Sequence, residues 1–233
     1  MKVAIQQPSY LPWCGYFAKM RQCDNFIILD NVQMPGGQSY LYRTKVRVSN
    51  GEIWLSIPTH HNLDSLISNV EFTDRRWSKK HLNTLRSSYG KSPYFSDVFS
   101  LLEPFYTQPG EMLSDFNTKL IIAIKDYLGI QCKITFASSI KTTGKSDDRL
   151  IELVKEMGGH TYISGKGGQK YQDPDKFKAA GINLAVAIYE PNPYKQIHGG
   201  FVGGLSIVDA LFNLGPQTIN LLVYSQLNQI INI

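Results

Sequence analysis

Residues 131–189, QCKITFASSIKTTGKSDDRLIELVKEMGGHTYISGKGGQKYQDPDKFKAAGINLAVAIY, decide the fold because strand-like and helix-like segments alternate along them. The strand-like runs are QCKITFASS, HTYISG and INLAVAIY, and the helix-like runs are DDRLIELVKEMGG and DPDKFKAAG. Such alternation is typical of crossovers between parallel strands. This third of the chain therefore predicts a parallel sheet flanked by helices.

The start of the chain predicts a further unit of the same kind. KVAIQ and NFIILD are short β-type runs that flank a helical stretch over residues 13–22. Cys14, Phe17 and Met20 suit one face of that helix. Between the first strand and the helix lies QQPSYLPWCGY, residues 6–16, which is rich in proline and aromatic residues.

The remaining segments predict a hairpin and several helices. SYLYRTKVRVS and EIWLSIP are joined by Asn50-Gly51, a strong signal for a tight hairpin turn. Residues 77–90 and 111–129 have helical patterns, and Gly129 supplies a stop for the second. The last stretch, residues 205–227, predicts two packed helices divided at Gly215-Pro216.

These elements predict a three-layer α/β fold with a mainly parallel, Rossmann-like sheet. A β-hairpin in the N-terminal half and a helical insertion or cap at about residues 76–128 are added to it, within one α/β domain over residues 1–233. In such folds ligands bind beyond the carboxyl ends of the strands. The loops to search are those after Ile5, Leu29, Phe136 and Ile163.

Composition limits the classes of partner. Hydrophobic residues make up 42% of the 233 residues and charged residues 18%, which is typical of globular proteins. There are 24 Lys and Arg against 19 Asp and Glu, and the formal charge of +5 slightly favours phosphates, nucleotides or RNA. The longest basic cluster lies within residues 75–80, so no nucleic-acid-binding arm is present and DNA is not expected as a partner.

The cysteines and the apolar runs predict the compartment. The three cysteines, Cys14, Cys23 and Cys132, form no C-x-x-C pair, which favours a reducing cytosol over a disulfide framework or a zinc site. No apolar run reaches membrane-spanning length. We therefore expect a cytoplasmic protein with no membrane insertion.

The turn after the first strand is the first candidate binding segment. Its place between a strand and a helix suits a ligand-facing wall, with helix-start amides near an anion and Gly15 allowing close approach. The residues expected to bind ligand are Gln6, Gln7, Pro8, Tyr10, Trp13, Gly15 and Tyr16. The alternative is that two prolines fix an irregular turn whose aromatic residues fill the core.

Two phosphate-binding motifs have partial matches. Trp13-x-Gly15-Tyr16 can be aligned with the H-x-G-H of nucleotidyl-transferring enzymes, but aromatic residues replace both histidines that would contact phosphate. TTGKS, residues 142–146, is similar to the end of a P-loop, but Ser139 stands where that motif needs glycine. A polar loop in which Ser146 or Asp147 caps the next helix is the simpler interpretation of TTGKS.

The glycine-rich loop ISGKGGQKY, residues 163–171, is the second candidate binding segment. It leaves a predicted strand with three glycines and two lysines, which can bring amides and ammonium groups close to a phosphate or carboxylate. The alternative is a flexible basic turn. The residues expected to bind ligand or balance its charge are Ser164, Gly165, Lys166, Gly167, Gly168 and Lys170.

Acid-base candidates are few. Asp30 ends a buried strand, where a carboxylate can be desolvated and used as a base or to hold an amine or hydroxyl, although it can equally form a turn. Arg43 lies in a strand and can clamp an anion or simply meet water. No spacing among the five histidines indicates a metal site.

The ordered set of these motifs resembles the WbqC-like protein family. The match lies in AIQQPSYLPWCGYFAKM, FIILDNVQ, YRTKV, WLSIP, W-x-K-K-H-L at residues 77–82, YISGKGGQKY and LSIVDALFNLG. It runs nearly the full length of the chain in one order.

The resemblance implies a role beside enzymes that make nucleotide-linked amino sugars for bacterial surface polysaccharides such as O-antigen. It suggests a transferase or amide-forming enzyme that places an aminoacyl group on the sugar amine. The donor is an acyl adenylate made from ATP or an aminoacyl-tRNA, which would make tRNA a second partner. From position and chemistry in this sequence, Asp30 would accept the amine proton or orient the sugar, with Lys166 or Arg43 balancing charge on oxygen. The alternative is a non-catalytic protein that binds a nucleotide sugar and delivers it to a partner enzyme.

Overall fold

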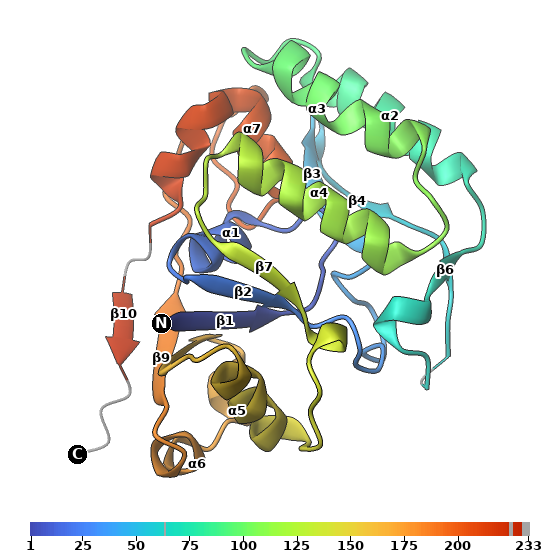
Figure 1. Cartoon of the computed structure of the whole chain (residues 1–233). Helices are drawn as coiled ribbons and strands as arrows, with labels where there is room; N and C mark the ends of the chain where they lie inside the picture. The colour runs from blue at the N-terminus through green and yellow to red at the C-terminus, as the bar shows by residue number, and fades with distance from the viewer. Residues whose placement is uncertain (63, 224–225, 230–233) are drawn as a thin grey trace.

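The centre of the fold is a sheet whose strands come from both ends of the chain (Figure 1). The computed structural model describes residues 1–62, 64–223 and 226–229. The sheet has the order β10-β9-β8-β1-β2-β7, and all its strands are parallel except β10, which runs antiparallel to β9. The strands are β1 (Lys2–Gln6), β2 (Asn25–Ile28), β7 (Lys133–Phe136), β8 (Thr161–Gly165), β9 (Asn183–Ile188) and β10 (Gln226–Gln229). The predicted three-layer α/β fold is confirmed.

Alternate residues of the central strand enter two separate apolar clusters. Ala4 packs with the cluster that contains α1 (Cys14–Arg21), whereas Val3 and Ile5 pack with the cluster that contains α5 (Ser146–Glu156) and α6 (Pro174–Ala179). Successive side chains of a strand point to opposite faces, so both faces of a buried strand must be apolar. The helices therefore form one layer on each side of the sheet (Figure 1).

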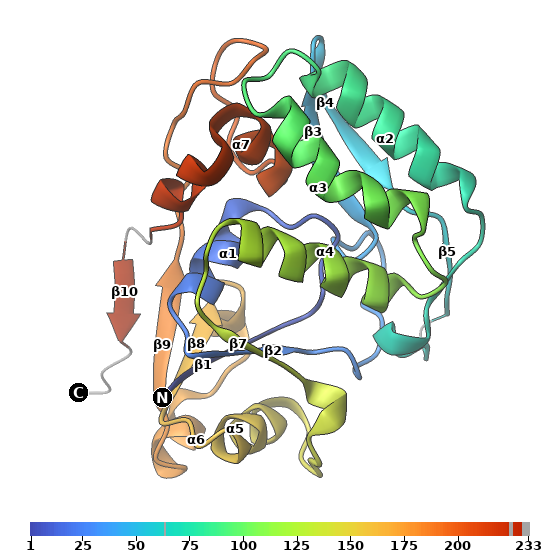
Figure 2. The same ribbon diagram turned by 45° about the horizontal axis from the view of Figure 1, so that its top comes forward.

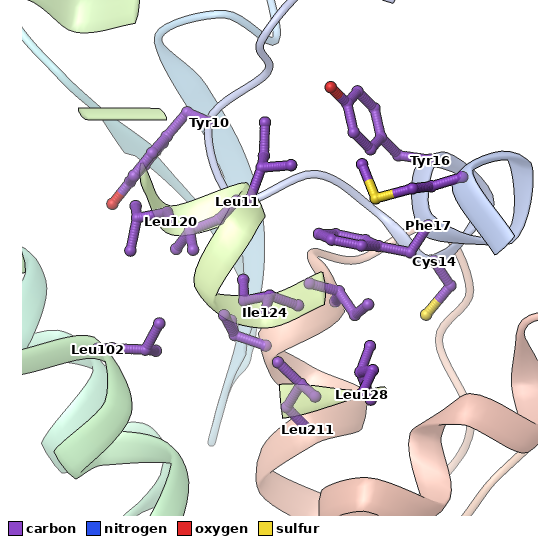
Figure 3. Close-up of a cluster of buried hydrophobic side chains, with 14 of the residues drawn as sticks. Tyr10, Leu11, Cys14, Tyr16, Phe17, Leu102, Leu120, Ile124, Leu128 and Leu211 are labelled. Carbon is purple, nitrogen blue, oxygen red and sulfur yellow. The ribbon is translucent and has the colours of Figure 1, made fainter. Parts of the chain in front are cut away.

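A second group of helices lies above α1, on the side away from α5 and α6 (Figure 2). It contains α2 (Arg76–Tyr89), α3 (Phe95–Thr107), α4 (Leu113–Tyr127) and α7 (Ile207–Leu214). Figure 3 shows Leu11, Phe17, Ile124 and Leu211, from four different segments, in one buried apolar cluster. The middle of the chain is helical, as the sequence predicts.

The predicted hairpin consists of β3 (Arg43–Val48) and β4 (Gly51–Ser56). The turn residues are Ser49 and Asn50, one position earlier than the Asn50-Gly51 signal suggests, and Gly51, which pairs with Val48 as the first residue of β4, has a positive φ of 131°. A second small pair joins β5 (Thr59–His60) to β6 (Glu71–Phe72). Short 3₁₀ turns occupy the remaining connections: η1 (Ile67–Asn69), η2 (Ala137–Ser139), η3 (Gly168–Lys170) and η4 (Gly215–Leu221).

The prediction of two packed helices over residues 205–227 is wrong in its second half. The α-helix ends at Leu214, and only the 3₁₀ turn η4 follows it. Residues 226–227 belong to β10, whose backbone pairs with β9. This pairing satisfies backbone groups of β9 that would otherwise form an open edge of the sheet. Residues 224–225 lie outside the described part of the chain.

The turn between β1 and α1 is held by side chains from several distant elements. The Leu11 carbonyl accepts hydrogen bonds from the Thr44 hydroxyl of β3 at 3.0 Å and from the Ser206 hydroxyl before α7 at 2.8 Å. The Pro8 carbonyl accepts one from the Asn117 amide of α4 at 2.9 Å. Prolines and an irregular backbone cannot satisfy these carbonyls within the turn, so other elements supply the donors.

We expect Asn117→Ala to lower the free energy of unfolding by at least about 2 kcal/mol, because it leaves two buried carbonyls without a donor. The Asn117 side chain is fully buried and also donates to the Leu41 carbonyl at 2.7 Å. Denaturant unfolding followed by circular dichroism measures the change. An unchanged midpoint for Asn117→Ala would show that the turn does not depend on this amide.

Candidate functional site

The candidate site lies where the strand order of the sheet reverses. The connection from β1 through α1 leads to β2 on one side, whereas the connection from β8 through α6 leads to β9 on the other. Helices that depart on opposite faces leave a crevice outside the carboxyl ends of the two strands, and ligands of open α/β sheets bind in such crevices. In this protein that position is beyond Gln6 of β1 and Gly165 of β8.

Two adjoining cavities occupy this position and are called the crevice below. One, of about 240 Å³, opens between the turn after β1 and the loop after β8, and the other, of about 400 Å³, opens between the same turn and β3. Gln6, Trp13 and Tyr16 line both. The larger cavity falls in the size range of small-molecule sites.

The structure brings the two predicted binding segments together. The smaller cavity is lined by the three shared residues and by Gly15, Lys19, Gly165, Lys166, Gly167, Ala187 and Tyr189. The larger is lined by the three shared residues and by Ser9, Pro12, Tyr40, Thr44, Lys45, Gly204 and Ser206. Residues about 150 positions apart thus face one space.

Trp13 lines both cavities. Its side chain is 42% exposed and makes an edge-to-face contact with Tyr189, with ring centroids 5.3 Å apart. A Cβ atom on Gly15 would lie only 2.5 Å from the indole ring, so glycine at this position lets the indole lie against the start of α1. A half-exposed indole fixed in this way offers a flat surface to a base or a sugar ring.

The loop after β8 divides into a lining part and a structural part. Gly165, Lys166 and Gly167 line the crevice, and a Cβ atom on either glycine would meet open space. Ser164 is buried and donates to the Gln172 side chain at 2.6 Å, and Gly168 packs against both groups. A side chain at position 168 would clash with Ser164 and Gln172, so glycine is required there for steric reasons.

Lys19 is the unusual charged group of the crevice. Its side chain is only 5% exposed, and its ammonium donates to the Ile5 carbonyl at 3.3 Å and to the Gln6 side chain. Burial lowers the pKa of Lys19 from 10.5 to about 8. A lysine in this state exchanges its proton near neutral pH and is suited to acid-base chemistry.

Lysines set the charge of the crevice. Lys19, Lys45 and Lys166 contribute to its walls, and no Asp or Glu is among the lining residues that the structure describes. Lys45 is paired with Glu52 at 2.8 Å on the outer side of the hairpin. The walls therefore favour a ligand that carries negative charge.

Tyr10 does not face the crevice. Its side chain is 1% exposed, and its hydroxyl bonds to Nδ1 of His81 at 2.9 Å and to the Tyr106 hydroxyl at 2.6 Å. Burial lowers the pKa of His81 to about 4, so the imidazole is neutral at physiological pH. The ring of Tyr10 fills the core, as the alternative interpretation of the turn had it.

Asp30 also lies away from the crevice. Its two carboxylate oxygens accept hydrogen bonds from the backbone amide of Ser138 at 2.9 Å and from the Ser138 hydroxyl at 2.6 Å. The side chain is buried and lines neither cavity. Asp30 thus ties the end of β2 to the turn after β7, and the expectation that it serves as the base in the crevice is corrected by this geometry.

The other predicted residues lie at the margins. Arg43 stacks on the Trp54 ring, with its guanidinium carbon 4.2 Å from the ring centroid, on the outer face of the hairpin and outside the crevice. Lys170 is exposed, and neither Lys170, Gln7 nor Pro8 lines the crevice. Only a subset of the predicted residues therefore meets at the site: Gln6, Trp13, Gly15, Tyr16, Gly165, Lys166 and Gly167.

The TTGKS loop binds a carboxylate from the protein itself. The backbone amides of Thr143 and Gly144 donate to the Glu152 carboxylate at 2.8 and 3.0 Å. These amides are engaged by a side chain of α5, so the loop does not present the amide nest of a P-loop. TTGKS is a polar loop that leads into a helix, but the expected cap by Ser146 or Asp147 is wrong: the N-cap of α5 is Lys145 without a side-chain cap, and the Asp147 carboxylate accepts from the Asp173 backbone amide at 2.9 Å instead.

Sequence reasoning missed Lys19 and most of the residues contributed by distant loops. Nearly all of α1 is buried, so Lys19 has no polar face to which it could be assigned. Its apolar neighbours Phe17, Ala18 and Met20 were the one available signal, because a lysine within such a run must bury its stem. Tyr189 and Gly204 are brought to the crevice only by the tertiary structure.

Comparison with known proteins identifies the family. The family model described as the WbqC-like protein family matches residues 7–221. The chain belongs to the WbqC-like protein family. This WbqC-like chain is 30% identical over 231 residues to the uncharacterized protein Rv1507c of Mycobacterium tuberculosis, covering 96% of this chain and 98% of that protein. No solved structure matches the chain.

The helices of this WbqC-like protein are short. Within residues 1–62, 64–223 and 226–229, no helix combines the length and the apolar character needed to cross a bilayer. The longest helix, α4, has 15 residues and interrupts its apolar positions with charged ones.

We expect Lys19→Met to raise the free energy of unfolding at pH 7 by on the order of 1–3 kcal/mol, because it removes a buried charge that has no carboxylate partner among the described residues. The folded pKa of Lys19 lies below its unfolded value, so the unfolded chain binds more protons between about pH 8 and pH 10.5 and native stability rises with pH there. Denaturant unfolding at pH 7, 8, 9 and 10 compares the two proteins. Parallel pH curves would contradict the assigned state of Lys19.

We expect Asp30→Ala to lower the free energy of unfolding by about 1–2 kcal/mol, because two hydrogen bonds from the exposed residue Ser138 to a buried carboxylate are lost. Ligands of the crevice should bind this variant as they bind the native protein. Denaturant unfolding and calorimetric titration measure the two quantities. If Asp30→Ala had native stability but no longer bound these ligands, Asp30 would be a residue of the binding site.

Proposed function

We propose that the crevice binds a nucleotide-linked amino sugar and that the protein forms an amide on the sugar amine, as a step in bacterial surface polysaccharide synthesis. The single observation that carries the proposal is the set of groups at the β1/β8 switch point: three lysines and an exposed indole, with no carboxylate among the described lining residues. A nucleotide sugar offers the matching groups, namely a diphosphate and flat rings.

The two ends of the crevice suit the two parts of such a ligand. Lys166 and the amides at Gly165 and Gly167 lie at the end of β8, where phosphates of α/β proteins are commonly bound. Trp13 lies across the crevice and supplies a surface for stacking. In the proposal the diphosphate meets the glycine-lysine loop, and the base or the sugar meets the indole.

Amide formation requires a neutral amine and a group that takes its proton. Lys19 lies in the same cavity as Lys166, and its lowered pKa of about 8 leaves part of the population neutral at physiological pH. In the proposed reaction the sugar nitrogen bonds to the acyl carbon of an activated donor, the leaving group departs with the bonding electrons, and Lys19 accepts the amine proton. An acyl adenylate and an aminoacyl-tRNA can each serve as the activated donor in this reaction.

A non-catalytic carrier of nucleotide sugars is the second candidate function. The absence of carboxylates from the described crevice walls favours it, because general-base catalysis usually relies on His, Asp or Glu. The two functions share the binding step and differ in turnover.

We expect calorimetric titration with nucleoside-diphosphate-linked amino sugars to detect binding, and Lys166→Ala to weaken it about tenfold through loss of a charge-assisted hydrogen bond. Lys119→Ala, which removes an exposed lysine of α4, is the matched control and should bind normally. Absence of binding by the native protein across a panel of such sugars would overturn the proposal.

We expect the native protein to convert the bound sugar and an activated aminoacyl donor to an amide, detected by mass spectrometry. Its kcat/KM should rise about tenfold per pH unit below about pH 8 and level off above it, since only neutral Lys19 accepts the proton. Lys19→Met should bind the sugar and lose turnover. Binding without product over all donors would assign the carrier function.

A further inference from the structure

The β3–β4 hairpin presents a cationic face beside the crevice. Strand alternation places Arg43, Lys45 and Arg47 of β3 on one side, opposite Ser56, Trp54 and Glu52 of β4. We call these six residues the hairpin face. The other side carries Thr44, Val46 and Leu55, which are buried in the main apolar cluster or bonded to the turn after β1.

An exposed aromatic pair lies within the row of cations. Trp54 is 40% exposed and Tyr40 is 62% exposed, with ring centroids 5.8 Å apart. The Arg43 guanidinium carbon lies 4.2 Å and the Lys45 ammonium 5.5 Å from the centroid of the Trp54 ring. Large aromatic side chains left in water among basic groups mark a binding surface.

The hairpin face is continuous with the crevice. Tyr40 and Lys45 line the larger cavity together with Trp13. Trp54 and Arg43 extend the same surface outward from Tyr40 and Lys45. A ligand laid along the hairpin face would therefore have its end in the crevice, next to the proposed sugar site.

We propose that the hairpin face binds the unpaired 3′ end of an aminoacylated RNA, whose terminal ester enters the crevice. This inference rests on the proposed function and identifies the acyl donor that the function leaves open. Bases stack on Trp54 and Tyr40, and the phosphates between them meet Arg43, Lys45 and Arg47. Such a combination of aromatic platforms and a basic track is how proteins bind single-stranded nucleic acid.

The extent of the hairpin face distinguishes RNA from an acyl adenylate. Residues two apart in a strand are separated by roughly 6.6 Å, so the three basic residues form a row about 13 Å long. An adenylate has one phosphate and one base, which the crevice alone can hold. Beyond Lys45 and Tyr40, which also line the crevice, the hairpin face offers Arg43, Arg47 and Trp54, and this extension suits a chain of several nucleotides. Glu52 lowers the charge of the face by one, which leaves a net positive row.

The group transfer then balances without a further reactant. The sugar nitrogen bonds to the ester carbonyl carbon, and the bond from that carbon to the ribose oxygen breaks with its electrons on oxygen. The amine proton passes to Lys19 and from there to the ribose oxygen. The products are the N-aminoacyl sugar and deacylated RNA.

Fluorescence anisotropy with a 5′-labelled, 12-nucleotide RNA ending in CCA tests the inference. We expect the native protein to bind it, Trp54→Ala to weaken binding by about fivefold to a hundredfold, and Arg43→Gln to weaken it and reduce the slope of log Kd against log salt by about 0.7. Matched controls are Tyr171→Ala, which removes an exposed aromatic residue elsewhere, and Arg86→Gln, which removes an arginine stacked on Phe99. Both controls should bind RNA normally.

Three outcomes would overturn the inference. In the first, the protein binds the nucleotide sugar but not the RNA. In the second, it binds dextran sulfate or blunt duplex RNA as tightly as the single-stranded RNA. In the third, the control variants lose as much RNA affinity as the hairpin-face variants. Calorimetry with the nucleotide sugar on the same preparations separates the two proposals. Sugar binding without RNA binding rejects only the RNA surface, whereas RNA binding without sugar binding rejects the proposed function.

Discussion

The Leu11 carbonyl is the contact on which the arrangement of the molecule depends. Leu11 has a positive φ of 38°, a conformation that costs about 1 kcal/mol or more for a residue with a side chain. The hydroxyls of Thr44 and Ser206 hold its carbonyl from two sides. One irregular turn therefore joins the hairpin and α7 to the end of β1, and the crevice is the space that this junction leaves open.

The crevice combines features that are unfavourable for stability. Lys19 is buried without a carboxylate among the partners that the structure gives it, and Trp13 exposes much of its indole to water. Buried charge and exposed aromatic surface both reduce the free energy of folding, and sites that bind or react commonly contain such features. Their coincidence at the switch point of the sheet is the strongest physical argument that this part of the WbqC-like protein is its functional centre.

The sequence predicted the sheet and its flanking helices well because these depend on local patterns. NFII can be buried on both faces only as a central strand, and Gly51, with its positive φ, permits a tight turn at Ser49 and Asn50 at little cost. The C-terminal segment was less predictable, because residues 226–227, which continue a helical sequence pattern, pair with β9 as part of β10. For the site, position at a strand end selected Gln6, Gly165 and Lys166, which line the crevice, but it also selected Asp30, which does not.

The sequence by itself determined that strands and helices alternate, and that a proline-aromatic turn and a glycine-lysine loop follow two of the strands. Only the tertiary structure decided which side chains at those places face a common space. Tyr10 and Trp13 lie three residues apart in one turn, yet the first is enclosed by His81 and Tyr106 and the second lines the crevice. The reason is physical: burial and pKa depend on groups that come from distant parts of the chain, and local sequence carries no record of them.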